Sequence, residues 1–134
     1  MGKGVWVYVG SRAGNKPSPK EKKVVSSACD TFIAERLMPK FLPEIRPTEF
    51  NYPIAISGKW RGNKYTFLTR YKSDDPRSLE PEFDAPFARL GYISRDLFDL
   101  SWRRHTGEWI RMFDRVSLVE ALRLIETEAF FAPC

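Results

Sequence analysis

Residues 87–113, FARLGYISRDLFDLSWRRHTGEWIRMF, decide the fold because they predict three successive β-strands. From Asp96 to Arg104 apolar and polar residues alternate, which is the period of a strand with one buried face. The predicted core-facing residues are Phe98, Leu100 and Trp102, and the opposite face carries Asp99, Ser101 and Arg103. The sheet therefore has one apolar face and one face of mixed character.

A three-residue loop, His105-Thr106-Gly107, is predicted to join this strand to the next, Glu108–Phe113. Glycine at the last loop position is typical of hairpins in which it adopts the left-handed conformation. If Arg104 pairs with Glu108, the register of the hairpin is fixed. Trp102 then lies opposite Ile110 and Leu100 opposite Met112 on the apolar face, and Arg103 lies opposite Trp109 and Ser101 opposite Arg111 on the other.

The segment before this stretch predicts a helix and a first hairpin. Ser18 as N-cap, Pro19 and Glu21 form a capping box, and the helix should end near Leu37 or Met38 because Pro39 follows. Its buried stripe should comprise Val25, Ala28, Cys29, Phe32, Ile33 and Leu37. Residues 50–71 predict two strands around a Gly62-Asn63 turn, and residues 72–85 predict an acidic surface loop.

The end of the chain predicts a short second helix. Ser117 and Glu120 form another capping box, and the helix should end near Glu128. Phe130 and Phe131 should fold back on the sheet or form an interface. The whole pattern predicts an α+β fold: an antiparallel sheet of about five strands, with helices on one face only. We expect a basic arm or linker at residues 1–17 and one domain at residues 18–134.

The net charge of +5 is concentrated at the N-terminal end. Residues 1–23 hold six basic residues and one acidic residue, which leaves sixteen of each for the rest of the chain. Basic residues beside aromatic ones are the groups that contact nucleic acid. The candidate binding residues of this segment are Lys3, Trp6, Arg12, Lys16, Lys20, Lys22 and Lys23. A frayed terminus or an edge strand at residues 2–9 is the structural alternative.

The composition indicates a protein that does not cross a membrane. The mean hydropathy is -0.41 and there is no long apolar run, so a transmembrane helix is not expected. The first residues lack the apolar run of a secretory signal. Two cysteines, Cys29 and Cys134, are too few for a disulfide framework. We therefore expect a cytoplasmic protein.

The residues favour a binding module over an enzyme. His105 is the only histidine, which excludes mechanisms that need two, and it falls in an exposed hairpin turn. No GxSxG elbow, GxxxxGK[ST] loop or GxGxxG motif is present. Cys29 falls on the buried stripe of a helix, and the acidic loop lacks the spacing of a calcium loop. We expect no catalytic residue, no metal ligand and no cofactor.

The polar face of the second hairpin is the remaining candidate site. Arg103, Trp109 and Arg111 could stack on bases and hold phosphates, whereas a solvated face would pair Asp99 with Arg111 and lay Arg103 over Trp109. The sequence thus predicts a non-enzymatic accessory module that joins a nucleic-acid or ribonucleoprotein assembly, or a protein partner, through its basic arm. The alternative is a small enzyme or ligand-binding domain that uses Asp99, Arg103 and Arg111 in a pocket.

The chain also resembles a family of small bacterial proteins classed as a domain of unknown function. The resemblance spans roughly residues 24–131. It is carried by Phe87-Ala88-Arg89, Phe98, Leu100, Trp102, Arg103, Trp109, Ser117-Leu118, Glu120-Ala121-Leu122 and Glu128-Ala129-Phe130-Phe131. Residues 1–23 and the His-Thr-Gly turn depart from the family's pattern. The resemblance implies the α+β fold and no particular activity.

Overall fold

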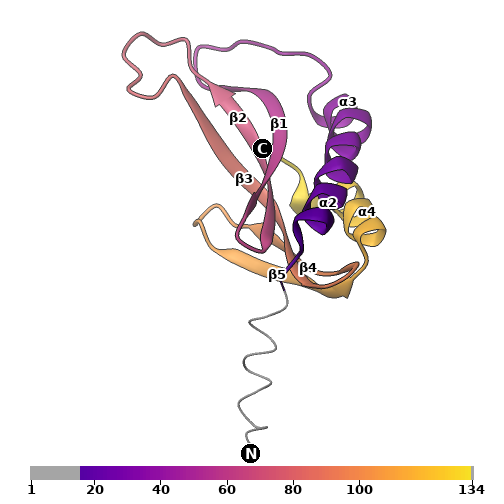
Figure 1. Ribbon diagram of the computed structural model, residues 1–134. Helices are drawn as coiled ribbons and strands as arrows, with labels where there is room; N and C mark the ends of the chain where they lie inside the picture. The colour runs from indigo at the N-terminus through magenta and orange to yellow at the C-terminus, as the bar shows by residue number, and fades with distance from the viewer. Residues whose placement is uncertain (1–15, 134) are drawn as a thin grey trace, which may run out of the picture.

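The sheet has five antiparallel strands, and each pairs with its neighbour in the chain. The computed structural model describes residues 16–133, so the predicted N-terminal strand at residues 2–9 lies outside the described residues. The strands are β1 (Tyr52–Arg61), β2 (Lys64–Lys72), β3 (Glu82–Ser94), β4 (Leu97–Arg103) and β5 (Trp109–Val116). The sheet twists strongly, so that β1 and β2 run across the direction of β4 and β5 (Figure 1). The predicted α+β fold is confirmed.

The first helix, α2 (Pro19–Phe32), begins as the sequence predicts. The Glu21 amide donates to Ser18 Oγ at 3.1 Å, and the Ser18 amide donates to Glu21 Oε1 at 3.0 Å. The hydrogen bond from the Ser18 amide and, second, one from the Tyr92 hydroxyl lower the pKa of the Glu21 carboxyl. The capping box therefore satisfies amides at the helix start and also ties α2 to β3.

The predicted end of this helix is wrong, because the chain stays helical through Pro39. A π-helical turn, Ile33–Leu37, leads into α3 (Met38–Phe41). The Met38 amide donates to the Ile33 carbonyl, so the hydrogen-bond register has already shifted by one residue before Pro39. Proline has no amide hydrogen and is tolerated in the first turn of a helical segment, which is the place that α3 gives it.

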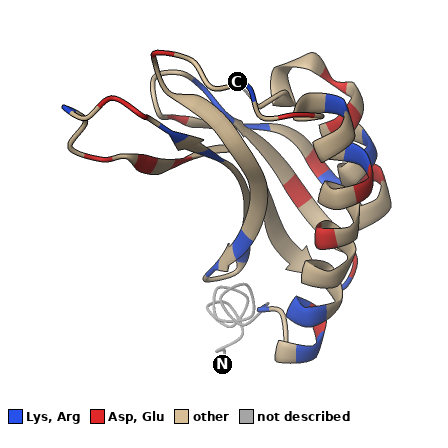
Figure 2. Ribbon diagram, turned by 90° about the horizontal axis from the view of Figure 1, so that it is seen from above, with Lys and Arg blue, Asp and Glu red and all other residues tan. Residues whose placement is uncertain are grey.

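The helices cover one face of the sheet and enclose the core. Figure 2 shows α2, α3 and α4 on the same side of the strands, with acidic and basic residues mixed along them. Cys29 and Leu37 from the first helical segment are fully buried, as are Phe67 and Leu100 from the sheet. Trp102 is half-buried and packs on Phe130, with ring centroids 6.2 Å apart. The opposite face carries no helix of the described chain.

The β4–β5 hairpin follows the predicted register at its turn and departs from it farther on. The Arg104 amide donates to the Glu108 carbonyl at 2.8 Å, and Gly107 has a φ of 91°. The predicted pairs Trp102–Ile110, Arg103–Trp109 and Ser101–Arg111 are present. Leu100, however, lies opposite Phe113 and not Met112, because the register shifts between Leu100 and Ser101. This bulge turns Phe113 toward Phe130 and Phe131 and leaves Met112 40% exposed.

The second helix, α4 (Leu118–Thr127), has only half of the predicted capping box. Ser117 Oγ accepts from the Glu120 amide at 3.2 Å, but the Glu120 carboxylate turns away to Arg123. Asp96, in the β3–β4 turn, accepts from the Leu118 amide at 2.9 Å instead. A distant residue thus completes the cap, which a local motif does not reveal. After α4, Phe131 is fully buried, so the predicted return of this segment to the sheet is confirmed.

Gly58 in β1 lies against the ring of Tyr65, so Gly58→Ala is expected to destabilise the protein. A Cβ at this position would lie 2.5 Å from Tyr65 Cε2, and Tyr65 is only 1% exposed and cannot move freely. Overpacking of this kind costs about 1–3 kcal/mol. Urea denaturation would measure the loss. Gly91→Ala is the control, because its Cβ would meet nothing closer than 3.6 Å, and equal losses in both variants would contradict the explanation.

Candidate functional site

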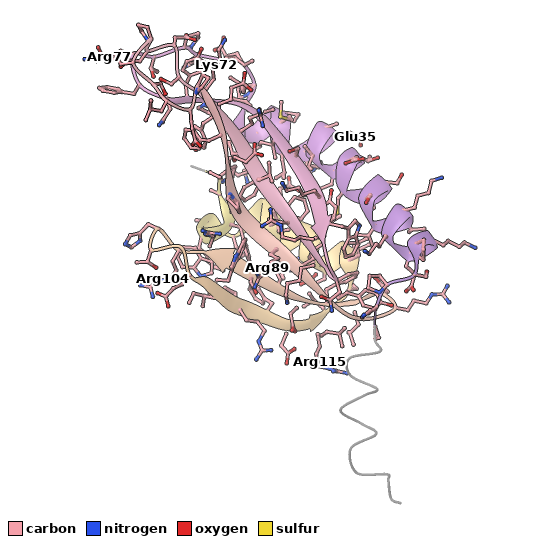
Figure 3. All side chains as sticks on the ribbon, turned by 60° about the vertical axis from the view of Figure 1, so that its left-hand side comes forward. Glu35, Lys72, Arg77, Arg89, Arg104 and Arg115 are labelled. Atoms are coloured by element: carbon pink, nitrogen blue, oxygen red, sulfur yellow. The ribbon has the colours of Figure 1, made fainter. Side chains whose placement is uncertain are left out.

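Five basic side chains surround a pocket of about 280 Å³ on the uncovered face of the sheet. They come from four adjacent strands: Lys59 and Arg61 from β1, Lys64 from β2, Arg89 from β3 and Arg103 from β4. The other lining residues are Thr66, Leu68, Asp84, Pro86 and Trp109. We call these ten residues the basic pocket. Figure 3 shows Arg89 over the middle of the sheet and Arg104 near the end of the β4–β5 hairpin.

Strand alternation places these side chains on the uncovered face. In β1, Ile56 faces the core, so Lys59 and Arg61 point to the opposite side. In β2, Tyr65 and Phe67 are buried in the core, which leaves the neighbouring Lys64 and Thr66 on the other face. The Gly62-Asn63 turn, where Gly62 has a φ of 65°, brings the basic ends of β1 and β2 together.

Trp109 reaches across β4 to contact Arg89. The Arg89 guanidinium carbon lies 4.3 Å from the centroid of the Trp109 ring, although β3 and β5 are not adjacent. Neighbouring strands are about 4.8 Å apart, so this contact forms above β4. Ser101, which pairs with both Arg89 and Arg111, has a short, buried side chain there. Arg103 adds a second cation 5.5 Å from the same ring centroid.

The positive charge of the basic pocket is not neutralised by the described part of the chain. Within residues 16–133, none of its five basic residues forms an ion pair with a carboxylate. Burial and, second, the positive charge of Arg103 lower the pKa of Arg89. Asp84, the one acidic residue that lines the pocket within the described chain, is bound at 3.0 Å by Arg70, which also binds Glu82 at 2.7 Å. The pocket is therefore arranged to receive an anion.

Asp99 and Arg111, two residues singled out from the sequence, pair with each other outside the basic pocket. Arg111 donates to Asp99 Oδ2 at 3.5 Å. Burial, followed by a hydrogen bond with the carboxyl of Asp114, raises the pKa of Asp99, and Arg111 opposes this shift. Of the residues predicted on this hairpin face, Arg103 and Trp109 line the basic pocket and Asp99 and Arg111 do not.

The predicted binding residues of the N-terminal segment are only partly within the described residues. Lys3, Trp6 and Arg12 are outside the described residues. Lys16 and Lys23 are exposed, and Lys22 Nζ lies 5.4 Å from the centroid of the Trp60 ring. Lys20 lines a different, larger cavity of about 620 Å³ between α2, the β3–β4 turn and the start of α4. Of the basic residues of this segment that the structure describes, none lines the basic pocket.

Four of the five basic residues of the basic pocket are not predicted from the sequence: Lys59, Arg61, Lys64 and Arg89. The excess of basic over acidic residues is zero after residue 23, and a count along the chain does not show that one face is enriched. Alternation along residues 50–71 places Lys59 on the face opposite Ile56. Combining that assignment with the order of the strands would have found part of the pocket.

The other potentially reactive side chains, His105 and Cys29, lie outside the basic pocket. His105 is exposed in the hairpin turn. Cys29 is fully buried, and burial followed by the charge of Asp30 raises the pKa of its thiol to about 12, which disfavours the nucleophilic thiolate. Among residues 16–133, no cluster of three or more His, Cys, Asp or Glu side chains is arranged to hold a metal ion. No helix in this range is long and apolar enough to span a membrane.

Fold and site together define a small α+β protein whose five-stranded meander is covered by helices on one face and carries a basic pocket on the other. The chain belongs to the family described as Domain of unknown function (DUF3024), whose model matches residues 17–133. This confirms the resemblance seen in the sequence and extends it to the start of α2. No curated protein and no solved structure matches the chain.

Proposed function

We propose that this protein is a non-enzymatic module that binds nucleic acid on the uncovered face of its sheet. The observation that carries the proposal is the basic pocket, in which five cations from four strands converge without a carboxylate partner among residues 16–133. Phosphate groups supply most of the affinity between proteins and nucleic acids, and lysine and arginine are their usual partners.

The chemistry of the basic pocket favours nucleic acid over other polyanions. A membrane is a flat surface and does not enter a concave pocket. An acidic peptide has carboxylates for the cations but no base to stack on the Trp109 ring. A nucleic acid has both phosphates for the cations and bases for the ring. The alternative of a small enzyme that uses Asp99, Arg103 and Arg111 has less support, because only Arg103 of these three lines the pocket.

We also predict that the basic N-terminal segment contributes to nucleic-acid binding. Lys3 and Arg12 would add phosphate contacts to those of the pocket, and Trp6 would add an aromatic one. Deleting residues 1–15 is expected to weaken binding and to reduce its salt dependence, while the pocket retains the remainder. Partner proteins in a ribonucleoprotein assembly would be recruited through the same bound nucleic acid.

The double substitution of Lys64→Gln and Arg89→Gln tests the proposal. Each lost phosphate contact reduces the slope of log affinity against log salt by about 1, so we expect the slope to fall by about 2 and the affinity to fall at every salt concentration. Fluorescence anisotropy with a labelled oligonucleotide, repeated over a range of salt concentrations, measures both quantities.

The matched control is Arg46→Gln with Arg77→Gln. These residues carry the same total charge, are highly exposed and do not line the basic pocket. Arg77 lies in the loop between β2 and β3, far from Arg89 in Figure 3. The control should bind like the unmodified protein. Equal losses in both double variants would mean that net charge and not the pocket governs binding, and the proposal would fail.

A further inference from the structure

The basic pocket is too small for a double helix and suits one unpaired nucleotide. Its volume of about 280 Å³ corresponds to roughly nine water molecules in the liquid. A duplex is a stiff rod that presents phosphates and groove edges on its surface, whereas its base faces are stacked inside. A duplex could therefore touch the rim of the pocket, but none of its bases could reach the Trp109 ring.

The planar side chains of the basic pocket are held in positions that allow a base to stack on them. The indole of Trp109 is only half-buried, and it is steadied by the Arg89 and Arg103 guanidinium groups, at 4.3 and 5.5 Å from its centroid. Aromatic rings and guanidinium planes are the surfaces on which proteins stack unpaired bases. These three groups come from three different strands, so their arrangement is fixed by the sheet and not by a mobile loop.

The remaining cations extend away from Trp109 along the sheet. Lys59, Arg61 and Lys64 stand on β1 and β2, whereas Arg103, beside Trp109, stands on β4. From β1 to β4 there are three strand spacings, or about 15 Å. At 3.4 Å per nucleotide of a stacked strand, that distance corresponds to about four nucleotides. Phosphates on either side of an inserted base would thus meet this row of cations.

We infer that the basic pocket binds single-stranded nucleic acid, with one unpaired base inserted against Trp109 and the flanking phosphates held by the cations of β1 to β4. This inference rests on the proposed function and adds the substrate class to it. Duplex nucleic acid binds the same surface only through its phosphates. Trp109 therefore contributes to the affinity for single strands alone.

The test compares Trp109→Ala and Trp109→Phe with the unmodified full chain on three labelled probes of about twelve nucleotides. The probes are single-stranded oligothymidylate, a duplex that contains it, and a strand of the same length made of abasic sites. Loss of a stacked base weakens binding by about 5- to 150-fold. We expect Trp109→Ala to lose that factor on oligothymidylate and to stay within about twofold on the other two probes. Trp109→Phe should retain most of the affinity, since it keeps an aromatic face.

Two results would overturn the inference. One is an equal effect of Trp109→Ala on all three probes, including no effect at all. The other is that free thymidine monophosphate displaces the oligonucleotide at the same nucleotide concentration, which would make the pocket a site for a free nucleotide. The abasic strand separates failure of this inference from failure of the proposed function. It retains only phosphates, so the loss of affinity that Lys64→Gln with Arg89→Gln causes on this strand tests phosphate binding alone. Thermal unfolding of each variant establishes that the sheet is intact.

Discussion

Replacing Phe131 with alanine is expected to lower the free energy of unfolding by about 3–5 kcal/mol. Phe131 is fully buried, and its ring centroid lies 4.7 Å from that of Phe130 and 6.3 Å from that of Phe113. The removed ring would leave a cavity between the helical layer and β5, where the surrounding aromatic rings are too rigid to collapse. Urea denaturation followed by tryptophan fluorescence would measure the change.

Val119→Ala provides the control for this substitution. Val119 lies on α4, close in sequence to Phe131, but its side chain is 80% exposed. A surface substitution of this kind changes stability by less than about 0.5 kcal/mol. If Phe131→Ala cost no more than the control, the 3-10 turn Ala129–Phe131 would not be an integral part of the core.

Raising the pH above 9 is expected to destabilise the protein through Cys29. The pKa of its thiol rises from 9.0 to about 12 on burial, so the unfolded chain loses this proton at lower pH than the folded protein does. The contribution to stability is fully present below pH 9 and is lost as the pH rises toward 12. Between pH 8 and pH 10.5, the free energy of unfolding should fall by about 2 kcal/mol from this group.

Comparison with Cys29→Ala isolates this effect from other alkaline titrations. Tyr65 also has a raised pKa because it is buried, and it destabilises both proteins at still higher pH. The unfolding free energies of the unmodified protein and Cys29→Ala should therefore converge as the pH rises from 8 to 10.5. Parallel curves would show that the thiol does not titrate differently in the folded and unfolded states. Cys134→Ser serves as a background in which Cys29 is the only thiol.

Local patterns predicted the elements of this fold well. The capping box at Ser18, the Gly62-Asn63 turn and the Arg104–Glu108 pair are decided by residues a few positions apart, and all three are present. Two of the errors have different causes, the first local and the second due to residues distant in the sequence. The helix passes Pro39 because a π-helical turn precedes it, and Phe113 displaces Met112 because the aromatic rings after α4 pack against it.

The candidate site was predictable only in part, for a similar reason. Arg103 and Trp109 were found because they face each other across one hairpin. Arg89 was not, because its contact with Trp109 crosses an intervening strand and depends on the short side chain of Ser101. By residue count, the chain after residue 23 is neutral. The fold, however, pairs carboxylates with arginines such as Arg70 and Arg123, and the described residues provide no carboxylate partner for the cations of the basic pocket.

Forming the sheet and forming the helical layer differ in the loss of chain entropy that loop closure causes during folding. Each strand pairs with its neighbour in sequence, so the five strands can assemble by closing short loops. The contact between the first and last helical segments is of the opposite kind: Arg36 binds Glu126, ninety residues away, at 2.8 Å. The helical segments also pack directly on the sheet, α2 and the π-helical turn on β1 and α4 on β4, and so cover its apolar face. We expect separation of these helical segments to expose the core, while the hairpins keep the local pairing on which the basic pocket depends.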